Sequence, residues 1–529
     1  MISFDSLTLK AWIEENREFL TGARIQKIQQ PTRKDFVLTL RSKGESKKLY
    51  ININPQFHHV CFMSKENEEK RLIEIPQKPP MFCMLLRKYL ENALISRVNQ
   101  PPYERILEFY IETYNELSEK IYLCLAVELM GKHSNVVLYN DDTNIILGCA
   151  HNVGAEKSRE REMAGTLPYI YPPKQNKSDI LTYNGEIDFQ TLDKDFYWFS
   201  KSFANQVKGC SFERLKNFVE LKNLSPAISK DFKEYTLFSK LLPDSVSKNS
   251  VNEMLDNYYT FYQAQDRFKN LKSHLLTLAS SKLKKAEVSI DKMNEQLNDV
   301  ENSNRYRLYG DLLMANLYNL KDFIPSAAVF NYENNSDLTI ELDPTKTIKE
   351  NANKFYKLYN KSKTKKAKLT ELLSDAEMSV KYLKEVVYTI ESSEDILNLF
   401  EIKAELEPEN VAKEKNKKAV LPEEIEVGGC KVFIGRNNRQ NDYIVSKLAK
   451  DEDFWFHTKD CPGSHVLLKC SEPSDELIFE CAKLAKKYSS GSNSSKVGVI
   501  YTKRKYLRKP PGANLGYVTY KNEKEILVD

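Results

Sequence analysis

Two long stretches of this chain repeat apolar residues in alternating steps of three and four. The first stretch carries Leu283, Ala286, Ile290, Met293, Leu297 and Val300. The second carries Leu369, Leu373, Ala376, Val380, Leu383, Val387 and Ile390. This stepping is typical of a coiled-coil helix, which buries its apolar side against a partner. Two such stretches in one chain therefore predict two long helices that pack along each other.

The segment between these stretches, residues 323–356, is rich in turn-forming residues. It contains Pro325, the cluster 334–336 and the pair 343–344, with a strand-like alternation at 338–342. A chain that reverses here would form an antiparallel hairpin, with arms of about 50 residues that each reach on the order of 75 Å. A parallel homodimer or a compact bundle would satisfy the same periodicity.

Length and charge limit the classes of protein that this chain can represent. A chain of 529 residues is too long for one core and predicts about three or four domains. The formal net charge of +5 is modest, so an anionic partner would have to be met by local basic patches. The N-terminal residues lack the pattern of a signal peptide, and no apolar run reaches the roughly 18 residues of a spanning helix. We expect a cytoplasmic protein that does not engage a membrane.

The first half of the chain predicts two modules. Strand-like runs and one proline-opened helix at 79–93 indicate a mixed α/β domain over residues 1–172. The strand-like runs are 36–42, 48–54, 105–113, 120–130 and 134–140. Residues 173–262 are expected to be mainly helical, and Gly209 separates two amphipathic pieces. That pattern is typical of a helix-hairpin-helix, whose amides can meet a phosphate, but a single glycine between helices by itself favours a plain structural turn.

The second half predicts the hairpin over residues 263–420 and a small α+β domain over residues 421–529. A charged, proline-marked linker at 415–424 separates them. The predicted fold class is therefore α+β multidomain.

Several motifs resemble one known family. The stretches GRNNRQND, DFWFHTKDCPGSHV and YTKRKYLRKPPGANLGYVTY resemble the C-terminal signature domain of the NFACT family. GARIQKIQQP, PPMFCMLLRKYL and ELMGKHSNVVLYN are similar to its N-terminal domain, and YGDLLMANLYNL and LDPTKTIKENANKFYKLYNK to its coiled-coil region. The motifs occur in the family's order along essentially the whole chain.

The resemblance implies both a fold and a function. The implied fold has a glycosylase-like N-terminal domain, a helix-hairpin-helix domain, a long antiparallel coiled-coil hairpin and a small RNA-binding C-terminal domain. The implied function is ribosome quality control: binding of an obstructed large ribosomal subunit with its peptidyl-tRNA, contact with rRNA, and recruitment of tRNA. In bacterial members the recruited tRNA is alanyl-tRNA, which extends the stalled chain with a C-terminal degradation tail. We expect a recruiter and not an enzyme, with no cofactor and with a second quality-control factor as a candidate partner.

The resemblance also assigns a tRNA-binding site. The family's Asp-Arg pair matches Glu104 and Arg105. Glu104 keeps the negative charge on a longer side chain, and Arg105 can make bidentate contacts with phosphate or base. Glu128 is a second candidate tRNA contact. Because Glu104 departs from the family's aspartate, the tRNA species and the composition of the tail stay open, and a strand-end ion pair is the structural alternative.

A basic segment near the C-terminus predicts a second RNA-binding surface. Its candidate residues are Lys503, Arg504, Lys505, Tyr506, Arg508 and Lys509. Cations neutralise phosphates, and aromatic faces stack on exposed bases. A solvated basic strand would show the same composition.

The turn that contains His457, Cys461 and His465 invites comparison with a zinc site. Residues 462–463 are Pro-Gly, which disfavours a helix that would align the three side chains, so we expect no metal. The nine cysteines contain no CxxC pair and are interpreted as reduced, small apolar residues. We assign the hairpin to an RNA-facing surface or to the domain core, through Trp455, His457, Lys459 and His465.

Two functions from other classes were weighed against this interpretation. A formamidopyrimidine-type DNA glycosylase would need an N-terminal proline amine followed by an acid, whereas this chain begins Met1-Ile2-Ser3. A surface fibronectin-binding adhesin would need an export signal, and the sequence shows no recognisable one.

Overall fold

The computed structural model describes residues 4–115, 117–156, 160–301, 303–408 and 421–529. The chain divides into two compact units, Met1–Arg267 and Phe268–Asp529. Among the helices that the structure describes, none has the length and apolar character needed to cross a membrane. Residues 415–420 of the predicted linker lie outside the described residues.

A nine-stranded antiparallel sheet forms the centre of the first unit, in the order β4-β3-β2-β1-β5-β6-β7-β8-β9. Its strands are β1 (Arg24–Thr32), β2 (Asp35–Ser42), β3 (Glu45–Asn52), β4 (His59–Phe62), β5 (Leu94–Asn99), β6 (Ile106–Tyr114), β7 (Lys120–Glu128), β8 (Asn135–Asn140) and β9 (Ile146–Cys149). The five strand-like runs in the sequence are confirmed by β2, β3, β6, β7 and β8. The predicted helix is α3 (Met81–Leu90).

Both faces of the central strands are covered. On β7, Leu123, Leu125 and Val127 enter one apolar cluster, while Cys124 and Ala126 enter a second. Successive side chains of a strand point to opposite faces, so these residues mark two cores on the two sides of the sheet. A strand buried on both faces reads as a nearly continuous apolar run, as residues 120–130 do.

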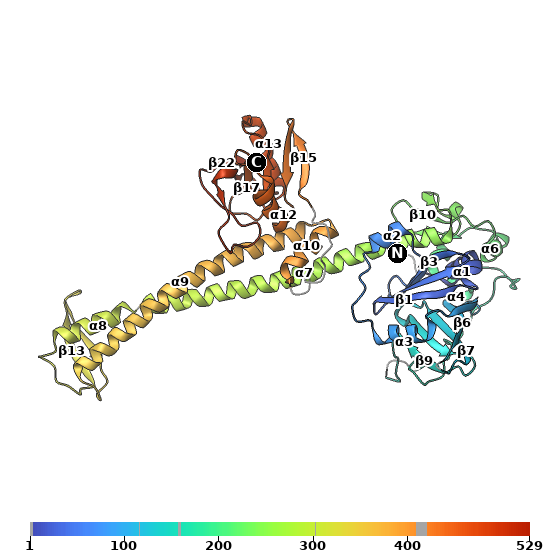
Figure 1. The fold of residues 1–529 in the computed structure, drawn as a ribbon, viewed down its shortest axis with the longest axis horizontal. Coiled ribbons are helices and arrows are strands. Elements are labelled where there is room, and N and C mark those ends of the chain that lie inside the picture. The colour runs from blue at the N-terminus through green and yellow to red at the C-terminus, as the bar shows by residue number, and fades with distance from the viewer. Residues whose placement is uncertain (1–3, 116, 157–159, 302, 409–420) are drawn as a thin grey trace. The chain divides into compact units, whose positions relative to one another are not determined.

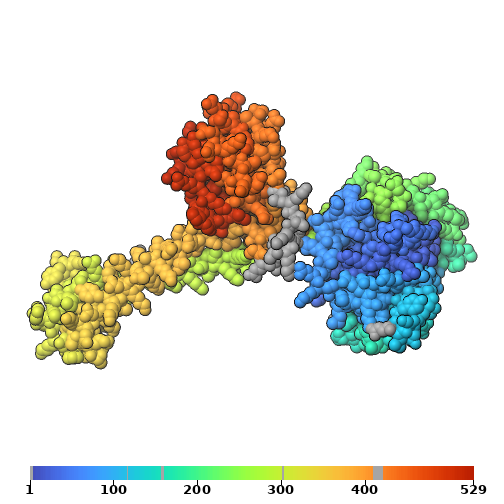
Figure 2. Space-filling model, viewed as in Figure 1, coloured from blue at the N-terminus to red at the C-terminus, as the bar shows by residue number. Residues whose placement is uncertain are grey.

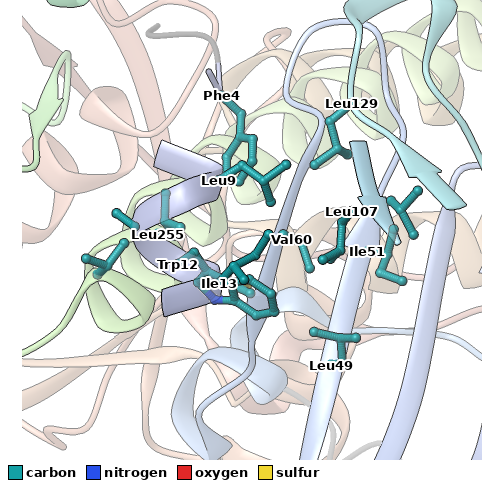
Figure 3. Packing of buried hydrophobic residues seen from close by; sticks show 14 of the residues in the cluster. Phe4, Leu9, Trp12, Ile13, Leu49, Ile51, Val60, Leu107, Leu129 and Leu255 are labelled. Atoms are coloured by element: carbon teal, nitrogen blue, oxygen red, sulfur yellow. The ribbon is translucent and has the colours of Figure 1, made fainter. Parts of the chain in front are cut away.

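The larger core lies between the sheet, helix α1 (Ser6–Leu20) and the start of helix α7 (Val251–Glu301). Figure 3 shows Trp12 and Ile13 of α1 packed with Leu255 of α7 and with Val60 of β4. The indole of Trp12 donates to Asn252 Oδ1 at 2.9 Å. Helix α1 and the first turns of α7 are thereby joined through one fully buried side chain.

A buried ion pair adds a second tie between α7 and the sheet. Arg71, at the end of α2 (Lys65–Arg71), donates through Nη1 to Asp256 Oδ1 at 2.5 Å, and both side chains are almost fully buried. The other oxygen of Asp256 accepts from the Ser64 backbone N–H at 3.0 Å and from Asn67 Nδ2 at 2.7 Å. The desolvated carboxylate is thus satisfied on both oxygens, which a buried charge requires.

Residues 173–250 are less helical than the sequence suggested. Gly209, with φ +80°, does form a turn between α5 (Lys201–Gln206) and α6 (Phe212–Val219), and a short α4 (Leu192–Asp195) precedes them. The chain then forms a three-stranded sheet of β10 (Ala227–Ser229), β11 (Tyr235–Thr236) and β12 (Ser245–Ser247). The helical expectation is wrong there because Asp231 accepts from the Lys233 backbone N–H at 3.1 Å, which favours a turn over a helix.

In the second unit, the later part of α7 packs against α9 (Ile348–Ser392), and the two helices run in opposite directions (Figure 1). Leu275 and Ala279 of α7 share a core with Val386 and Ile390 of α9. Farther along α7, Glu287 approaches Lys384 at 3.6 Å. The predicted apolar stretches are partly or fully buried, whereas most neighbouring positions are exposed. The antiparallel arrangement predicted for these helices is confirmed, and its long helices are consistent with a coiled coil.

The reversal between the two helices contains a small module of its own. Helix α8 (Asn304–Ala315) and the hairpin of β13 (Ser326–Asn331) and β14 (Ser336–Glu341) enclose a separate apolar cluster with the start of α9. The strand-like alternation at 338–342 is therefore confirmed. Thr347 and Glu350 form a reciprocal capping box that starts α9.

The C-terminal residues 421–529 form a six-stranded antiparallel sheet in the order β15-β16-β18-β17-β19-β22, covered by α13 (Asp475–Lys487). Figure 2 shows these residues, orange to red, gathered in one body. The strands are β15 (Glu423–Val427), β16 (Cys430–Ile434), β17 (Phe454–Thr458), β18 (Val466–Leu468), β19 (Val497–Lys503) and β22 (Lys524–Val528), with a separate small pair β20 (Leu507–Arg508) and β21 (Thr519–Tyr520).

The GRNNRQND motif connects this domain to the hairpin. Asn437 caps α12 (Asn438–Tyr443) by accepting from the Gln440 backbone N–H at 2.9 Å. Its Nδ2 donates at 2.7 Å to Glu401 on α10 (Ile396–Leu406). The motif thus has a structural role, because one amide side chain both begins a helix and meets a buried carboxylate of the hairpin base.

We expect Asp256→Ala to destabilise the first unit by about 3–5 kcal/mol, because Arg71 would stay buried without its counter-charge. Hydrogen exchange of peptides from β4 and α2 measures this as a lower free energy of opening. The matched control is Lys70→Ala on α2, next to Arg71, which removes an exposed pair with Glu66 and should change that free energy by less than about 1 kcal/mol. Equal effects of the two substitutions would contradict the assignment.

Candidate nucleic-acid interface

The pairing of β6 with β7 brings together the residues predicted for tRNA binding. In the register of this pair, Ile106 lies opposite Glu128. One step beyond the strand, the Leu129 backbone N–H donates to the Arg105 carbonyl at 2.8 Å. Glu104 and Arg105 are therefore held at the end of the sheet where Glu128 ends β7. The predicted residues 104, 105 and 128 are neighbours in the folded chain.

Arg105 is half-buried and its guanidinium is not paired. Within the described part of the chain, neither a hydrogen bond nor an ion pair joins this guanidinium to another group. Burial lowers the pKa of Arg105, with Asp5 and Glu104 acting against that shift. Burial likewise raises the pKa of Glu104, opposed by Arg105 and Arg161. A partly desolvated guanidinium without an internal partner is suited to an anionic ligand, which would replace the lost hydration.

Glu128 has a different environment, because its side chain is 0% exposed. Arg161 donates to it through both terminal nitrogens, one of them at 2.8 Å, and the Tyr169 hydroxyl donates to it at 2.9 Å. Arg161 also donates to the Ile170 carbonyl at 2.9 Å. Glu128 therefore anchors the segment 161–171 against the sheet, and its carboxylate is occupied within the protein.

A cavity of about 1320 Å³ lies beside Arg105. Its titratable lining comprises Arg33, Arg105, Lys132, His133, His151 and Arg161 together with one acid, Glu160, and its apolar lining includes Pro80, Met81, Phe82, Leu85 and Met130. Met81, the first residue of α3, is 88% exposed. Cations on one part of a cavity and apolar side chains on another suit a nucleotide, which combines a phosphate with an apolar base face.

Sequence reasoning assigned no role to most of the cavity residues. Lys132 and His133 lie in a short 3-10 turn, Gly131–His133, directly after the stretch that contains Glu128, so their proximity in sequence was an available signal. Arg33 lies in the turn between β1 and β2, and Arg161 lies 33 residues after Glu128. Neither position carries a local pattern that connects it to the Glu104–Arg105 pair.

The basic C-terminal segment is partly neutralised by acidic side chains. Lys503 and Lys505 both pair with Glu452, at 2.6 and 2.7 Å. The two lysines lower the pKa of Glu452 to about 2. Lys509 pairs with Asp442. The patch therefore presents less positive charge than its sequence indicates.

Two arginines of the same segment differ in role. Arg504 donates through Nε to the Val445 carbonyl at 2.7 Å and through Nη1 to the Leu507 carbonyl, so it supports the local backbone. Arg508 on β20 is exposed, and in the described residues its guanidinium meets neither a hydrogen-bond acceptor nor a carboxylate. Tyr506 is half-buried, with the Lys505 ammonium 5.5 Å from its ring centroid. Arg508 is thus the cation of this segment most available to a phosphate.

The aromatic hairpin packs mainly inward. Trp455 is 2% exposed and lies in an apolar cluster with Leu467 and Ile500. Its ring is parallel to His457 at 5.8 Å and perpendicular to His465 at 5.1 Å. These contacts place Trp455 and His465 in the domain core, which was one of the two interpretations of this hairpin.

The two histidines of the hairpin are neutral at physiological pH. Burial, followed by the nearby Lys381, lowers the pKa of His457 to about 4. Burial lowers the pKa of His465 as well. Lys459 is exposed and pairs with Glu525 at 2.7 Å. In the described part of the chain, no three His, Cys, Asp or Glu side chains are grouped closely enough to hold a metal ion.

Comparison with known proteins assigns nearly the whole chain to named domains. The family model described as NFACT N-terminal and middle domains matches residues 5–220 and 211–423. The family model described as NFACT protein RNA binding domain matches residues 424–522.

Similar full-length proteins are known from bacteria. A Bacillus subtilis protein named Rqc2 homolog RqcH is 31% identical over 565 residues, an alignment that covers 100% of this chain and 98% of the relative. The protein of the same name from Streptococcus suis is 31% identical over 547 residues, with the same coverage. The solved N-terminal part of a fibronectin/fibrinogen-binding protein from Streptococcus suis is 28% identical, with a TM-score of 0.43, and covers 49% of this chain and 99% of that one. From the matches along its full length, the chain belongs to the NFACT family.

Proposed function

We propose that this protein acts in ribosome-associated quality control by holding RNA through separate surfaces on one chain. It binds a large ribosomal subunit obstructed by peptidyl-tRNA and recruits a tRNA, expected to be alanyl-tRNA, so that the ribosome adds a C-terminal degradation tail. Family membership and the match to an RNA-binding domain support the general function. The tRNA species, the tail and a second factor belong to the proposal.

The observation that carries the proposal is the unpaired Arg105 at the basic cavity. An anionic ligand that enters there would meet the side chain of Arg105, whose backbone is held by a hydrogen bond at the end of the β6–β7 ladder, so the main chain needs little ordering on binding. Phosphate contacts and bidentate base contacts both need a cation of this geometry. In this proposal Arg105 contacts the tRNA. Glu104 partly offsets the positive charge of Arg105, and Glu128 acts indirectly by holding Arg161.

The proposal divides the work among four regions. Residues 1–172 and 173–262 form the tRNA-recruiting N-terminal and helix-hairpin-helix domains, 263–420 form the hairpin that reaches across the subunit, and 421–529 bind RNA. The protein itself breaks and forms no covalent bond in this scheme. Peptidyl transfer remains with the ribosome.

The general function is tested by sedimentation and by sequencing of bound RNA. We expect the tagged protein in a cell lysate to migrate with free large subunits on a sucrose gradient, and the RNA that copurifies to be enriched in one tRNA species. Exposure of the protein on intact cells, with no ribosomal association, would instead support the fibronectin-binding adhesin.

Arg105→Ala should lower tRNA affinity by about 10- to 100-fold, the value of about 1–3 kcal/mol expected for a lost bidentate contact. The substitution should leave the melting temperature nearly unchanged, because the Arg105 guanidinium makes no hydrogen bond or ion pair with any residue that the structure describes. Filter binding at several salt concentrations measures the affinity. The slope of log affinity against log salt concentration should become shallower by about one, the value of one lost phosphate contact.

Glu128→Gln is the matched comparison for Arg105→Ala. It removes the negative charge that faces the largely buried Arg161, so affinity and thermal stability should fall together, with a stability loss of about 3–5 kcal/mol. Arg105→Lys should restore only part of the affinity, because an ammonium lacks the planar donor pair. Unaltered tRNA binding by Arg105→Ala would contradict the assignment of Arg105 as a tRNA contact.

Glu452→Gln should strengthen binding of single-stranded RNA by the C-terminal domain and make it more salt-dependent, because Lys503 and Lys505 would lose their competing carboxylate. Arg508→Ala should weaken that binding. Fluorescence anisotropy of the full-length protein with a labelled RNA measures both changes, with Glu472→Gln, an exposed acid elsewhere in the domain, as the control. An affinity that responds equally to Glu452→Gln and Glu472→Gln would argue against a local RNA surface.

A further inference from the structure

Two cysteines of the C-terminal domain lie near adjacent ends of neighbouring strands: Cys430 begins β16, and Cys470 comes two residues after the end of β18. In the antiparallel pair β16–β18, Val432 faces Leu468, and the Lys469 backbone N–H donates to the Lys431 carbonyl at 3.0 Å. Extending this register two residues beyond the Val432–Leu468 pair would place Cys430 opposite Cys470. The hydrogen bond belongs to the neighbouring residue pair, so the two cysteines would occupy a non-hydrogen-bonded position of the ladder.

That position has the spacing a disulfide needs. Opposite residues at non-hydrogen-bonded positions have Cα atoms about 4.5 Å apart, and a disulfide spans Cα separations of about 4.4–6.8 Å. Side chains alternate along a strand, so Cys430 and Cys470 lie on the same sheet face as Val432 and Leu468. Both thiols border the core between the sheet and α13, and they are half-exposed. A small reagent can therefore reach them without unfolding of the domain.

The surroundings distinguish this pair from other cysteines of the chain. Cys61 is fully buried beside Arg71 and Asp256, and Cys124 is enclosed within the second core of the first unit. The side chain of Cys470 is close enough to that of Cys430 to contribute to the raised pKa of the Cys430 thiol. Cys481 of α13 lies in the same apolar cluster but is 0% exposed.

We propose that Cys430 and Cys470 are a redox modification site that a low-molecular-weight disulfide converts into a cross-strand disulfide. The thiolate of one cysteine attacks a sulfur of the reagent, whose S–S bond breaks and releases one thiol. The second cysteine attacks the resulting mixed disulfide, forms the internal S–S bond and releases the second thiol. The protein loses two hydrogen atoms, that is two protons and two electrons, and the reagent gains them as its two thiols form, so the exchange is balanced.

The exchange should be slow at neutral pH and faster in mild alkali. Burial, followed by the nearby Cys470 side chain, raises the pKa of the Cys430 thiol, which lowers the fraction of attacking thiolate. Once formed, the bond would join β16 to β18 and close the chain between them. A closed loop restricts the unfolded chain and so stabilises the folded domain.

The test treats the reduced full-length protein with oxidised glutathione and reads the products by mass spectrometry. We expect the intact mass to fall by two hydrogen atoms, a proteolytic fragment that joins the Cys430 and Cys470 peptides, and a rate that rises as the pH is raised toward about 9. The oxidised protein should melt at a higher temperature than the reduced protein. Reduction with dithiothreitol should reverse both changes.

Three variants make the result specific. Cys430→Ser should give a glutathione adduct at Cys470 in place of the internal disulfide. Cys481→Ser should still form the Cys430–Cys470 disulfide. Cys461→Ser, which alters a half-exposed cysteine in a turn of the same domain, should behave as the parent protein. Stable glutathione adducts on both Cys430 and Cys470 of the parent protein, or a bond from either residue to Cys481, would overturn the proposal.

Discussion

The ladder between β6 and β7 is the constraint on which the candidate tRNA site depends. It places the end of β7 beside the start of β6, so Arg105 and Glu128 become neighbours through backbone hydrogen bonds. The sheet is covered on both faces there, which leaves the carboxylate of Glu128 in an apolar environment. A charge in that position must be paired, and Arg161 provides the counter-charge. The pairing holds residues 161–171 on the sheet, and that segment supplies part of the cavity lining.

The two RNA-facing surfaces proposed here differ in their electrostatics. Arg105 is half-buried, and among the described residues its guanidinium has no bonded partner, so a ligand phosphate would restore interactions that water no longer provides. The lysines of the C-terminal segment are exposed or half-exposed and already paired with Glu452 or Asp442. Exposed pairs contribute little to stability, so they can exchange one anion for another at low cost. The surface around Arg105 is therefore suited to selective binding of one RNA ligand. The C-terminal basic segment is suited to RNA binding that weakens as the salt concentration rises.

Local sequence patterns predicted those helices and strands whose formation depends mainly on residues close together in the sequence. The alternating steps from Leu283 to Val300 and from Leu369 to Ile390 predicted α7 and α9, because one apolar face is enough to define an amphipathic helix. Strand β10 (Ala227–Ser229) was not predicted from the sequence. It is short, and it pairs with β11 and β12 in a segment rich in turns. Short strands depend on partners that no local window contains.

The sequence by itself determined the family, the helical hairpin and the choice of Glu104, Arg105 and Glu128 as a group, since motifs and periodicity are properties of the linear chain. Only the tertiary structure decided their separate roles: Arg105 is left unpaired, whereas Glu128 is buried against Arg161. The fold also enclosed Trp455 and placed Glu452 between two lysines. Burial and pairing arise from residues that are distant in sequence, so composition and spacing cannot specify them.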